Sequence, residues 1–159
     1  MIVPDVNLLI YAYDATSPHH RAARLWWERT LSGSRTVGIP WVVVLAFVRL
    51  MTHPTLSDNP MTVGRAREIV EEWLAVPTVR LLTPGPHAFR LLFDLLENAG
   101  TGGNLCTDAM IAAHADEHGG EVHTADRDFT RFPTTRCHYP LNDPPPSSAG
   151  PAVNAPSRR

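Results

Sequence analysis

The sequence predicts one α/β domain, a three-layer sandwich in which a mostly parallel sheet is covered by helices on both faces. Short apolar runs alternate with longer segments whose apolar residues recur at helical spacing. Proline, glycine or a capping residue stands at many of the boundaries between them. Strands that alternate with helices favour parallel pairing, because each helix returns the chain to the starting edge of the sheet.

The first part of the chain follows this alternation. Residues 2–5 are a predicted buried strand, and the apolar residues of 6–13 suit a helix packed on the sheet. Ser17 stands before Pro18, which places a capping residue ahead of a proline at the first helical position. This pair predicts a second helix that ends near Ser32.

Residues 36–39 are the next predicted strand, and the segment 41–51 after it is ambiguous. Its β-branched run suggests a strand, whereas its length after Pro40 suits a buried helix. Further on, Thr62 can cap a helix over 63–75. The apolar face of that helix is expected to consist of Ile69, Val70, Trp73 and Leu74.

Strands and helices also alternate in the second half of the chain. The expected elements are a strand at 79–82, a helix from Pro86 to near Gly100, a helix after Asn104 that closes at Gly119, and strands at 121–124 and 136–138. The residues expected to face inward from the helix that begins at Pro86 are Phe89, Leu92, Phe93 and Leu96.

Length and composition indicate one globular domain over residues 1–141, followed by a flexible Pro/Ser-rich tail at 142–159. The net charge of −2 argues against a high-affinity nucleic-acid scaffold, but not against a nuclease whose acidic pocket binds a metal ion. The two cysteines have no CxxC spacing, which suits a reducing cytoplasm. No apolar run approaches the ~18 residues of a membrane-spanning helix, so no membrane association is expected.

Acidic residues stand at three predicted boundaries between strands and helices. Asp5 ends the first strand, Asp108 lies near the start of a helix, and Asp126 and Asp128 follow the strand at 121–124. Each has an ordinary structural explanation: a helix cap, a favourable charge near a helix N-terminus, or a turn residue. Together they suggest more, because such boundaries line up along one edge of a parallel sheet. Converging carboxylates predict a site for a hard divalent cation and metal-assisted phosphodiester chemistry.

These residues also resemble a known family, the PIN domains, and in particular the VapC-type toxins of bacterial toxin–antitoxin pairs. The resemblance covers nearly the whole chain to about Leu141, and its four blocks occur in the family's order and spacing. The matching segments are Asp5-Val6-Asn7-Leu8-Leu9, Phe47-Val48-Arg49, Thr107-Asp108-Ala109 with Ile111-Ala112-Ala113, and Glu117-His118-Gly119 followed by Thr124-Ala125-Asp126-Arg127-Asp128-Phe129.

The resemblance implies a homodimeric α/β/α domain that cleaves RNA with Mg²⁺ or Mn²⁺ and is neutralised by a VapB-type antitoxin encoded beside it. Carried over by residue, it makes Asp5, Asp108 and Asp126 the metal ligands, with Asp128 as an additional catalytic carboxylate. Asn7 would orient Asp5 or cap its helix, and Thr124 would support the site near Asp126.

One position departs from the family pattern. Many members carry a glutamate in the segment that matches 45–49, where this chain has Ala46. Asp128, or a water held by Asn104, could replace the missing ligand. The alternatives are weak metal affinity or lost catalysis, in which case the chain would be a non-catalytic PIN module that binds RNA or a protein partner. A phosphatase with an aspartyl nucleophile is disfavoured, because Asn7 stands where a second Asp is usual and the chain has no lysine.

Histidines and aromatic residues give weaker signals. His114 and His118 are spaced i, i+4, which could place two metal ligands on one helix face, but no HExxH motif accompanies them and packed or solvent-facing histidines are the simpler interpretation. The four tryptophans favour packing in the core or a dimer over stacking on bases. Phe47 and Trp73 are candidates for an interface with a second copy or an antitoxin, because such toxins commonly use this region.

Overall fold

In the computed structural model, the chain is described over residues 1–56 and 59–142. The predicted tail lies outside the described residues from 143 onward, and Asn142 still belongs to the last short helical turn. In the part of the chain that the structure describes, no helix is both long enough and apolar enough to cross a membrane.

A five-stranded sheet forms the centre of the fold, and all of its strand pairs are parallel. The strands are β1 (Ile2–Pro4), β2 (Val37–Pro40), β3 (Val79–Leu82), β4 (Glu121–His123) and β5 (Cys137–His138), in the spatial order β3-β2-β1-β4-β5. Strands β1 and β2 are wholly buried, as expected of strands covered on both faces. The predicted mostly parallel sheet is thus confirmed.

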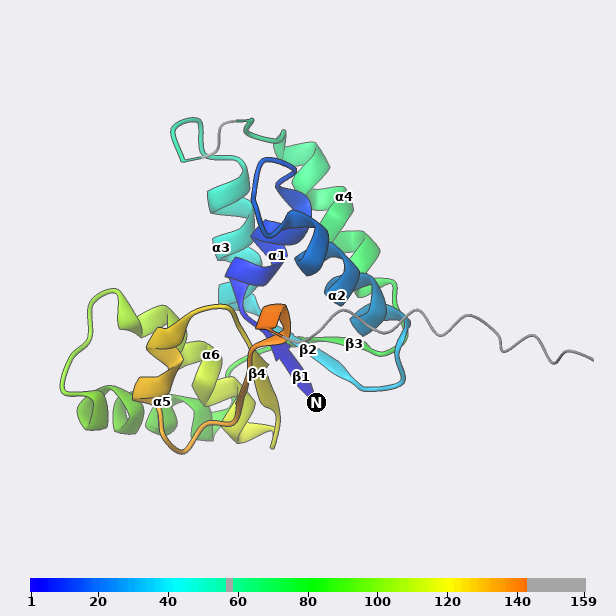
Figure 1. Ribbon diagram of the computed structural model, residues 1–159. Coiled ribbons are helices and arrows are strands. Elements are labelled where there is room, and N and C mark those ends of the chain that lie inside the picture. The colour runs from blue at the N-terminus through cyan, green and yellow to red at the C-terminus, as the bar shows by residue number, and fades with distance from the viewer. Residues whose placement is uncertain (57–58, 143–159) are drawn as a thin grey trace, which may run out of the picture.

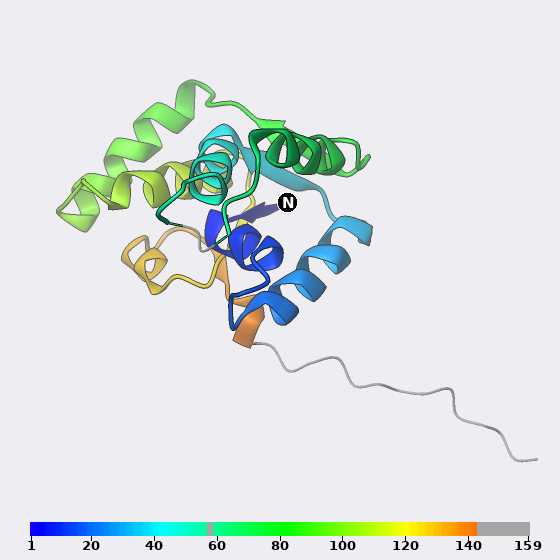
Figure 2. The same cartoon turned by 90° about the horizontal axis from the view of Figure 1, so that it is seen from above.

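Helices occupy both sides of this sheet. They are α1 (Val6–Tyr13), α2 (His20–Ser32), α3 (Trp41–Met51), α4 (Val63–Leu74), α5 (Pro86–Ala99) and α6 (Leu105–Glu117), with short 3₁₀ turns at η1 (Arg127–Arg131) and η2 (Pro140–Asn142). Figures 1 and 2 show α1–α4 gathered on one side, and α5 with α6 on the other. Right-handed connections explain the division, because the face on which a connecting helix lies then depends on the direction in which the chain crosses the sheet. The chain moves from β1 through β2 to β3, and then moves back past β1 to β4, so α5 and α6 lie on the opposite face.

The structure resolves the ambiguous segment 41–51 as a helix. Val43, Val44, Phe47 and Met51 are buried at helical spacing, while Leu45 is 63% exposed. Pro40 ends β2 and stands just before the helix, where its lack of an N–H group leaves no intrahelical bond unmade. Burial of one stripe against the sheet therefore outweighs the β-branched character of the segment.

Sequence predictions for three helices, α2, α4 and α5, need correction. On α4, Leu74 is expected on the apolar face but is 40% exposed. The second helix begins at His20, not at Pro18, because residues up to His19 form a turn in which the Ser17 hydroxyl accepts from the His19 N–H group at 3.2 Å. On α5, Phe89 and Phe93 are 69% and 47% exposed, so they do not face inward.

The predicted helix ends at Thr62 and Gly100 are confirmed. The Thr62 hydroxyl accepts from the Arg65 N–H group at 3.1 Å and caps α4. Gly100 ends α5 with φ of 71°, a left-handed conformation that glycine adopts without a Cβ clash.

An aromatic cluster fills the core between the sheet and α1–α4. The Trp73 ring centre lies 4.8 Å from that of Phe47 and 5.7 Å from those of Trp27 and Tyr13. The Trp73 Nε1–H group donates to the Tyr13 hydroxyl at 2.8 Å, so its one polar atom is satisfied. The sequence left open whether Phe47 and Trp73 lie at an interface or in the core; both are at most 1% exposed, so they are core residues.

Candidate active site

The candidate active site lies where β1 and β4 end side by side. The chain leaves β1 toward β2 and leaves β4 toward β5, so the two connections diverge at the carboxyl edge, which is where open parallel sheets form a binding crevice. Asp5 directly follows β1, and its backbone N–H group donates to the His123 carbonyl of β4 at 2.8 Å. This bond places Asp5 beside Thr124, the first residue after β4.

The Thr124 hydroxyl connects the residues around this crevice. It donates to Asp5 Oδ2 at 2.6 Å and accepts from Asn7 Nδ2 at 3.3 Å and from the Asp126 N–H group at 2.9 Å. A hydroxyl has one proton and two lone pairs, so all of its hydrogen-bonding capacity is used. Thr124 is fully buried, and its bonds fix the Asp5 carboxylate and the start of the acidic turn relative to each other.

Asp5 occupies the N-cap position of α1, yet its side chain makes no capping hydrogen bond. Its carboxylate is 2% exposed and is held by Thr124 instead. Burial and the bond from Thr124 distinguish Asp5 from an ordinary exposed helix cap, although the backbone N–H groups of Val6 and Asn7 lie close enough to lower its pKa. The Asn7 side chain contacts Thr124 and also accepts from the Ala125 N–H group at 3.3 Å, so it positions the carboxylate through the threonine.

Three further carboxylates lie together at the same edge. Asp108 stands in the first turn of α6, and because α6 ends just before β4 begins, that turn must lie at the carboxyl edge. Asp108, Asp126 and Asp128 each offer an oxygen within 4.8 Å of the others. Asp126 caps η1 by accepting from the Asp128 N–H group at 2.8 Å, which turns both side chains to the same region. Asp5 is not part of this close trio, although its charge acts on Asp108.

The pKa values reflect this crowding of negative charge. Burial raises the pKa of Asp5 to about 6, although the hydrogen bond from Thr124 opposes the rise. Burial also raises the pKa of Asp108 to about 7, and the charges of Asp5, Asp126 and Asp128 add to the effect. Carboxylates that repel one another in a partly buried site fit a hard divalent cation, which would offset their charge.

Arginines flank the acidic turn at its outer side. The Arg127 guanidinium lies 4.4 Å from the centre of the Tyr139 ring, and Arg131 donates to the Ala99 carbonyl at 3.2 Å. Both side chains belong to exposed residues. They bring positive charge to the border of a strongly negative site.

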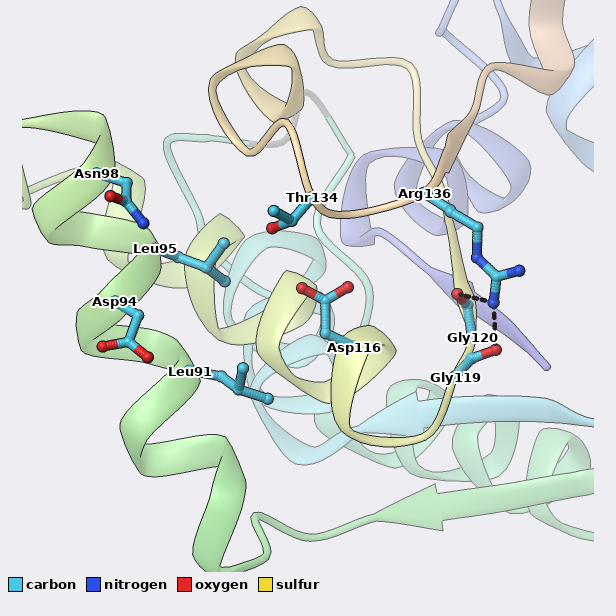
Figure 3. Close-up of a pocket in the computed structure, with 9 residues that line it drawn as sticks. All are labelled: Leu91, Asp94, Leu95, Asn98, Asp116, Gly119, Gly120, Thr134 and Arg136. Atoms are coloured by element: carbon cyan, nitrogen blue, oxygen red, sulfur yellow. Dashed lines mark hydrogen bonds between the residues drawn. The ribbon is translucent and has the colours of Figure 1, made fainter.

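A separate pocket lies near the other end of α6 (Figure 3). Two of its polar side chains have structural partners: Asp116 accepts from the Thr135 hydroxyl at 2.9 Å, and Arg136 donates to the Gly119 and Gly120 carbonyls. These bonds fasten the connection between β4 and β5. The pocket does not include any of the four acidic candidates.

Comparison with known proteins identifies relatives of this chain. A family model described as PIN domain matches residues 2–134. The ribonuclease VapC33 of Mycobacterium tuberculosis is 37% identical over 143 residues, which cover 90% of this chain and all of that protein. The ribonuclease VapC37 of the same organism is 40% identical over 140 residues, or 88% of this chain and 97% of that protein.

Solved structures share the fold at lower sequence identity. VapBC2 from Rickettsia felis, bound to a DNA fragment from its promoter, gives a TM-score of 0.63 at 18% identity and covers 87% of this chain and 98% of that chain. VapC20 of Mycobacterium tuberculosis, a toxin that cleaves the sarcin–ricin loop, gives a TM-score of 0.62 at 17% identity, and the match covers 82% of this chain and 93% of that chain. At these identities the likeness establishes the architecture alone.

Proposed function

Because this chain belongs to the PIN-domain family and matches the VapC ribonucleases over nearly their whole length, we propose that it is an endoribonuclease that uses Mg²⁺ or Mn²⁺ and acts as the toxin of a toxin–antitoxin pair. The observation that carries the proposal is the gathering of carboxylates at the crevice between β1 and β4. Such a site can bind a cation, which would assist the hydrolysis of an RNA phosphodiester bond.

Asp5, Asp108 and Asp126 would hold the cation. A bound Mg²⁺ would polarise the phosphodiester group and make an attacking water more acidic. Asp5 contributes a carboxylate that Thr124 holds in one orientation, and Asp126 a carboxylate fixed by its turn. Asp126 and Asp128 are exposed, so either carboxylate can accept the proton of the attacking water.

Asp128 would take the place of the acidic residue missing at Ala46. Its carboxylate belongs to the same group as Asp108 and Asp126, so the number of acidic ligands is restored from another segment. Ala46 itself favours the alternative function, a PIN module that binds RNA or protein without cleaving. Arg127 and Arg131 lie where a phosphate backbone could approach in either case.

We also propose that the protein works in the cytoplasm as a homodimer, and that an antitoxin of the VapB type restrains it. The structural neighbours from Rickettsia felis and Salmonella typhimurium are toxin–antitoxin complexes bound to DNA, which supports this assembly. The exposed apolar residues Trp41 and Leu45 of α3 offer surface for such contacts.

The deciding experiment is cleavage of total bacterial RNA by the purified protein, free of antitoxin, with Mg²⁺, Mn²⁺ or EDTA. We expect metal-dependent cuts that leave 5′-phosphate ends and that disappear in Asp5→Ala and Asp108→Ala. Asp94→Asn is the matched control, because Asp94 is an exposed aspartate on α5 outside the acidic group. Folded wild-type protein that binds RNA without cutting it would support the non-catalytic module, and 2′,3′-cyclic phosphate ends would contradict the hydrolytic mechanism.

A further inference from the structure

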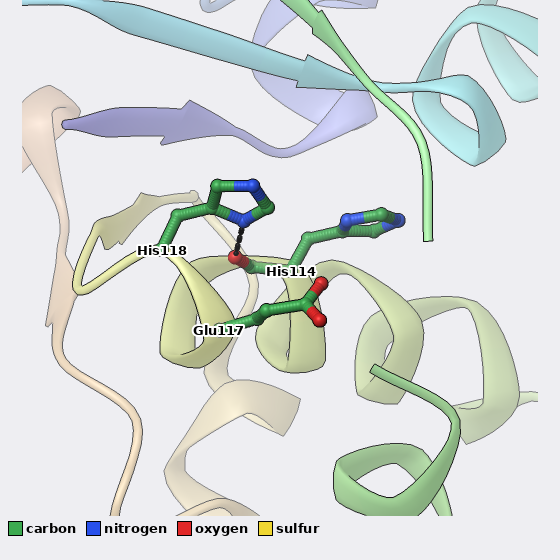
Figure 4. Close-up of side chains that lie close together, drawn as sticks. All are labelled: His114, Glu117 and His118. Carbon is green, nitrogen blue, oxygen red and sulfur yellow. Dashed lines mark hydrogen bonds between the residues drawn. The ribbon is translucent and has the colours of Figure 1, made fainter. Parts of the chain in front are cut away.

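A second group of potential metal ligands lies at the C-terminal end of α6. His114, Glu117 and His118 each offer a ligand atom within 4.8 Å of the others (Figure 4). They follow Asp108 by six to ten residues on the same helix, so roughly 9–15 Å of helix axis separates them from the acidic site. The group is therefore distinct from the candidate active site.

His114 has an unexplained polar atom. Its side chain is 1% exposed, and its Nδ1 is buried without a hydrogen-bond partner among the described residues. A buried polar atom left without a hydrogen-bond partner destabilises the folded state. Figure 4 shows the Glu117 carboxylate below the His114 ring, and a ring nitrogen of His114 lies within 4.8 Å of a Glu117 oxygen.

The tautomer of His118 leaves one ring nitrogen free to bind a metal ion. Its Nδ1 contacts the His114 carbonyl at 2.9 Å, and because a carbonyl can only accept, Nδ1 must carry the proton. The neutral ring then has its lone pair on Nε2, the usual tautomer when a backbone carbonyl supports a ligating histidine. His118 is exposed, so an ion can reach this side of the group from solvent.

Glu117 is held in place from the neighbouring helix. Its Oε2 accepts from the Gly85 N–H group at 3.2 Å and its Oε1 from the Ala88 N–H group at 3.1 Å, which caps the start of α5. Carboxylates that ligate metals are commonly supported by such hydrogen bonds. Capping explains the position of Glu117, but it does not satisfy His114 Nδ1.

We propose that His114, Glu117 and His118 bind a late first-row transition cation, Zn²⁺ being the best match. Two imidazoles and one carboxylate suit Zn²⁺ and do not suit Mg²⁺, which prefers oxygen ligands alone. In a tetrahedral zinc site neighbouring ligand atoms lie roughly 3.4 Å apart, so the exposed His118 ring would have to turn its Nε2 toward His114 and Glu117 when the ion binds. Water would complete the coordination, and the ion would tie the end of α6 to the start of α5 through Glu117.

The test is Zn²⁺ titration of the full chain, prepared without a polyhistidine tag and in excess Mg²⁺ so that the acidic site is filled. Calorimetry and the visible spectrum of bound Co²⁺ would report affinity and ligand type. We expect one Zn²⁺ per chain and a rise in Tm on binding. His118→Gln should weaken binding by more than about tenfold, because one of three protein ligands is lost.

Two matched variants locate the ion. His19→Gln removes an exposed histidine outside the group and should leave binding unchanged, and Asp108→Asn should leave it unchanged as well. Three results would overturn the proposal. They are Zn²⁺ binding as tight in His118→Gln as in the wild type, loss of binding in Asp108→Asn, and no binding by the wild type itself. None of these outcomes depends on whether the protein cleaves RNA.

Discussion

Asp108→Asn should abolish RNA cleavage and yet stabilise the metal-free protein at pH 8. The substitution keeps the size and shape of the side chain but removes one negative charge from a site that holds four carboxylates. Burial and the charges of Asp5, Asp126 and Asp128 raise the pKa of Asp108 from 3.8 to about 7. Above that pH the ionised Asp108 destabilises the folded state relative to the unfolded chain.

The magnitude follows from the difference between the two pKa values. About three pH units correspond to about 4 kcal/mol at full strength. Solvent reaches this half-buried group and four coupled carboxylates share the repulsion, so we expect about 2 kcal/mol. For a chain of this length, that amounts to a rise in Tm of about 4–8 °C.

The sign of the pH dependence is a further check. Between pH 3.8 and about 7 the folded state binds more protons at Asp108 than the unfolded state, so wild-type stability falls as the pH rises through this range. The advantage of Asp108→Asn should therefore be largest at pH 8 and shrink toward pH 4. Urea unfolding in EDTA at pH 8 and pH 5 measures it, with Asp94→Asn as the control. An Asp108→Asn variant no more stable than wild type at pH 8, or an advantage that does not shrink at pH 5, would refute the reasoning.

The remaining predictions concern two threonines. Thr124→Val should lower the free energy of unfolding by about 1–3 kcal/mol and should also slow RNA cleavage, because Asp5 and Asp126 lose a shared hydrogen-bond partner. Thr124→Ser keeps the hydroxyl and should retain most of the stability and the activity. A fully active valine variant would contradict this role of Thr124. Thr62→Ala should cost about 1 kcal/mol through loss of the α4 cap, measured by urea unfolding, while RNA cleavage stays at the wild-type rate. Unchanged stability would show that the cap contributes nothing.

The four acidic candidates were predictable from the sequence because their positions depend on local order. Asp5 ends an apolar run, and Asp126 and Asp128 follow another, so each had to lie at the end of a strand. Parallel pairing then brings the ends of β1 and β4 together, whatever the details of packing. The succession of strands and helices was predictable for the same reason, since capping residues and periodicity act over a few residues.

Helix rotation was not predictable in the same way. Both faces of α5 carry apolar residues, and the sequence pattern favoured Phe89 and Phe93 as the buried side. In the structure Ala88 and Leu95 are buried instead, and α6, the helix that packs on α5, is rich in fully buried alanines. Small side chains let two helices approach closely, and this preference appears only when both partners are present.

The sequence by itself determined the order of the elements, the parallel sheet and the edge at which the carboxylates would meet. Only the tertiary structure decided that Thr124 joins Asp5 to Asp126, that Asp128 belongs with Asp108, and that Glu117 reaches from α6 to cap α5. The physical reason is the separation along the sequence between the residues that interact. Caps and periodicity are contacts within a few residues, whereas a hydroxyl that satisfies a carboxylate 119 residues away depends on the packing of the whole domain.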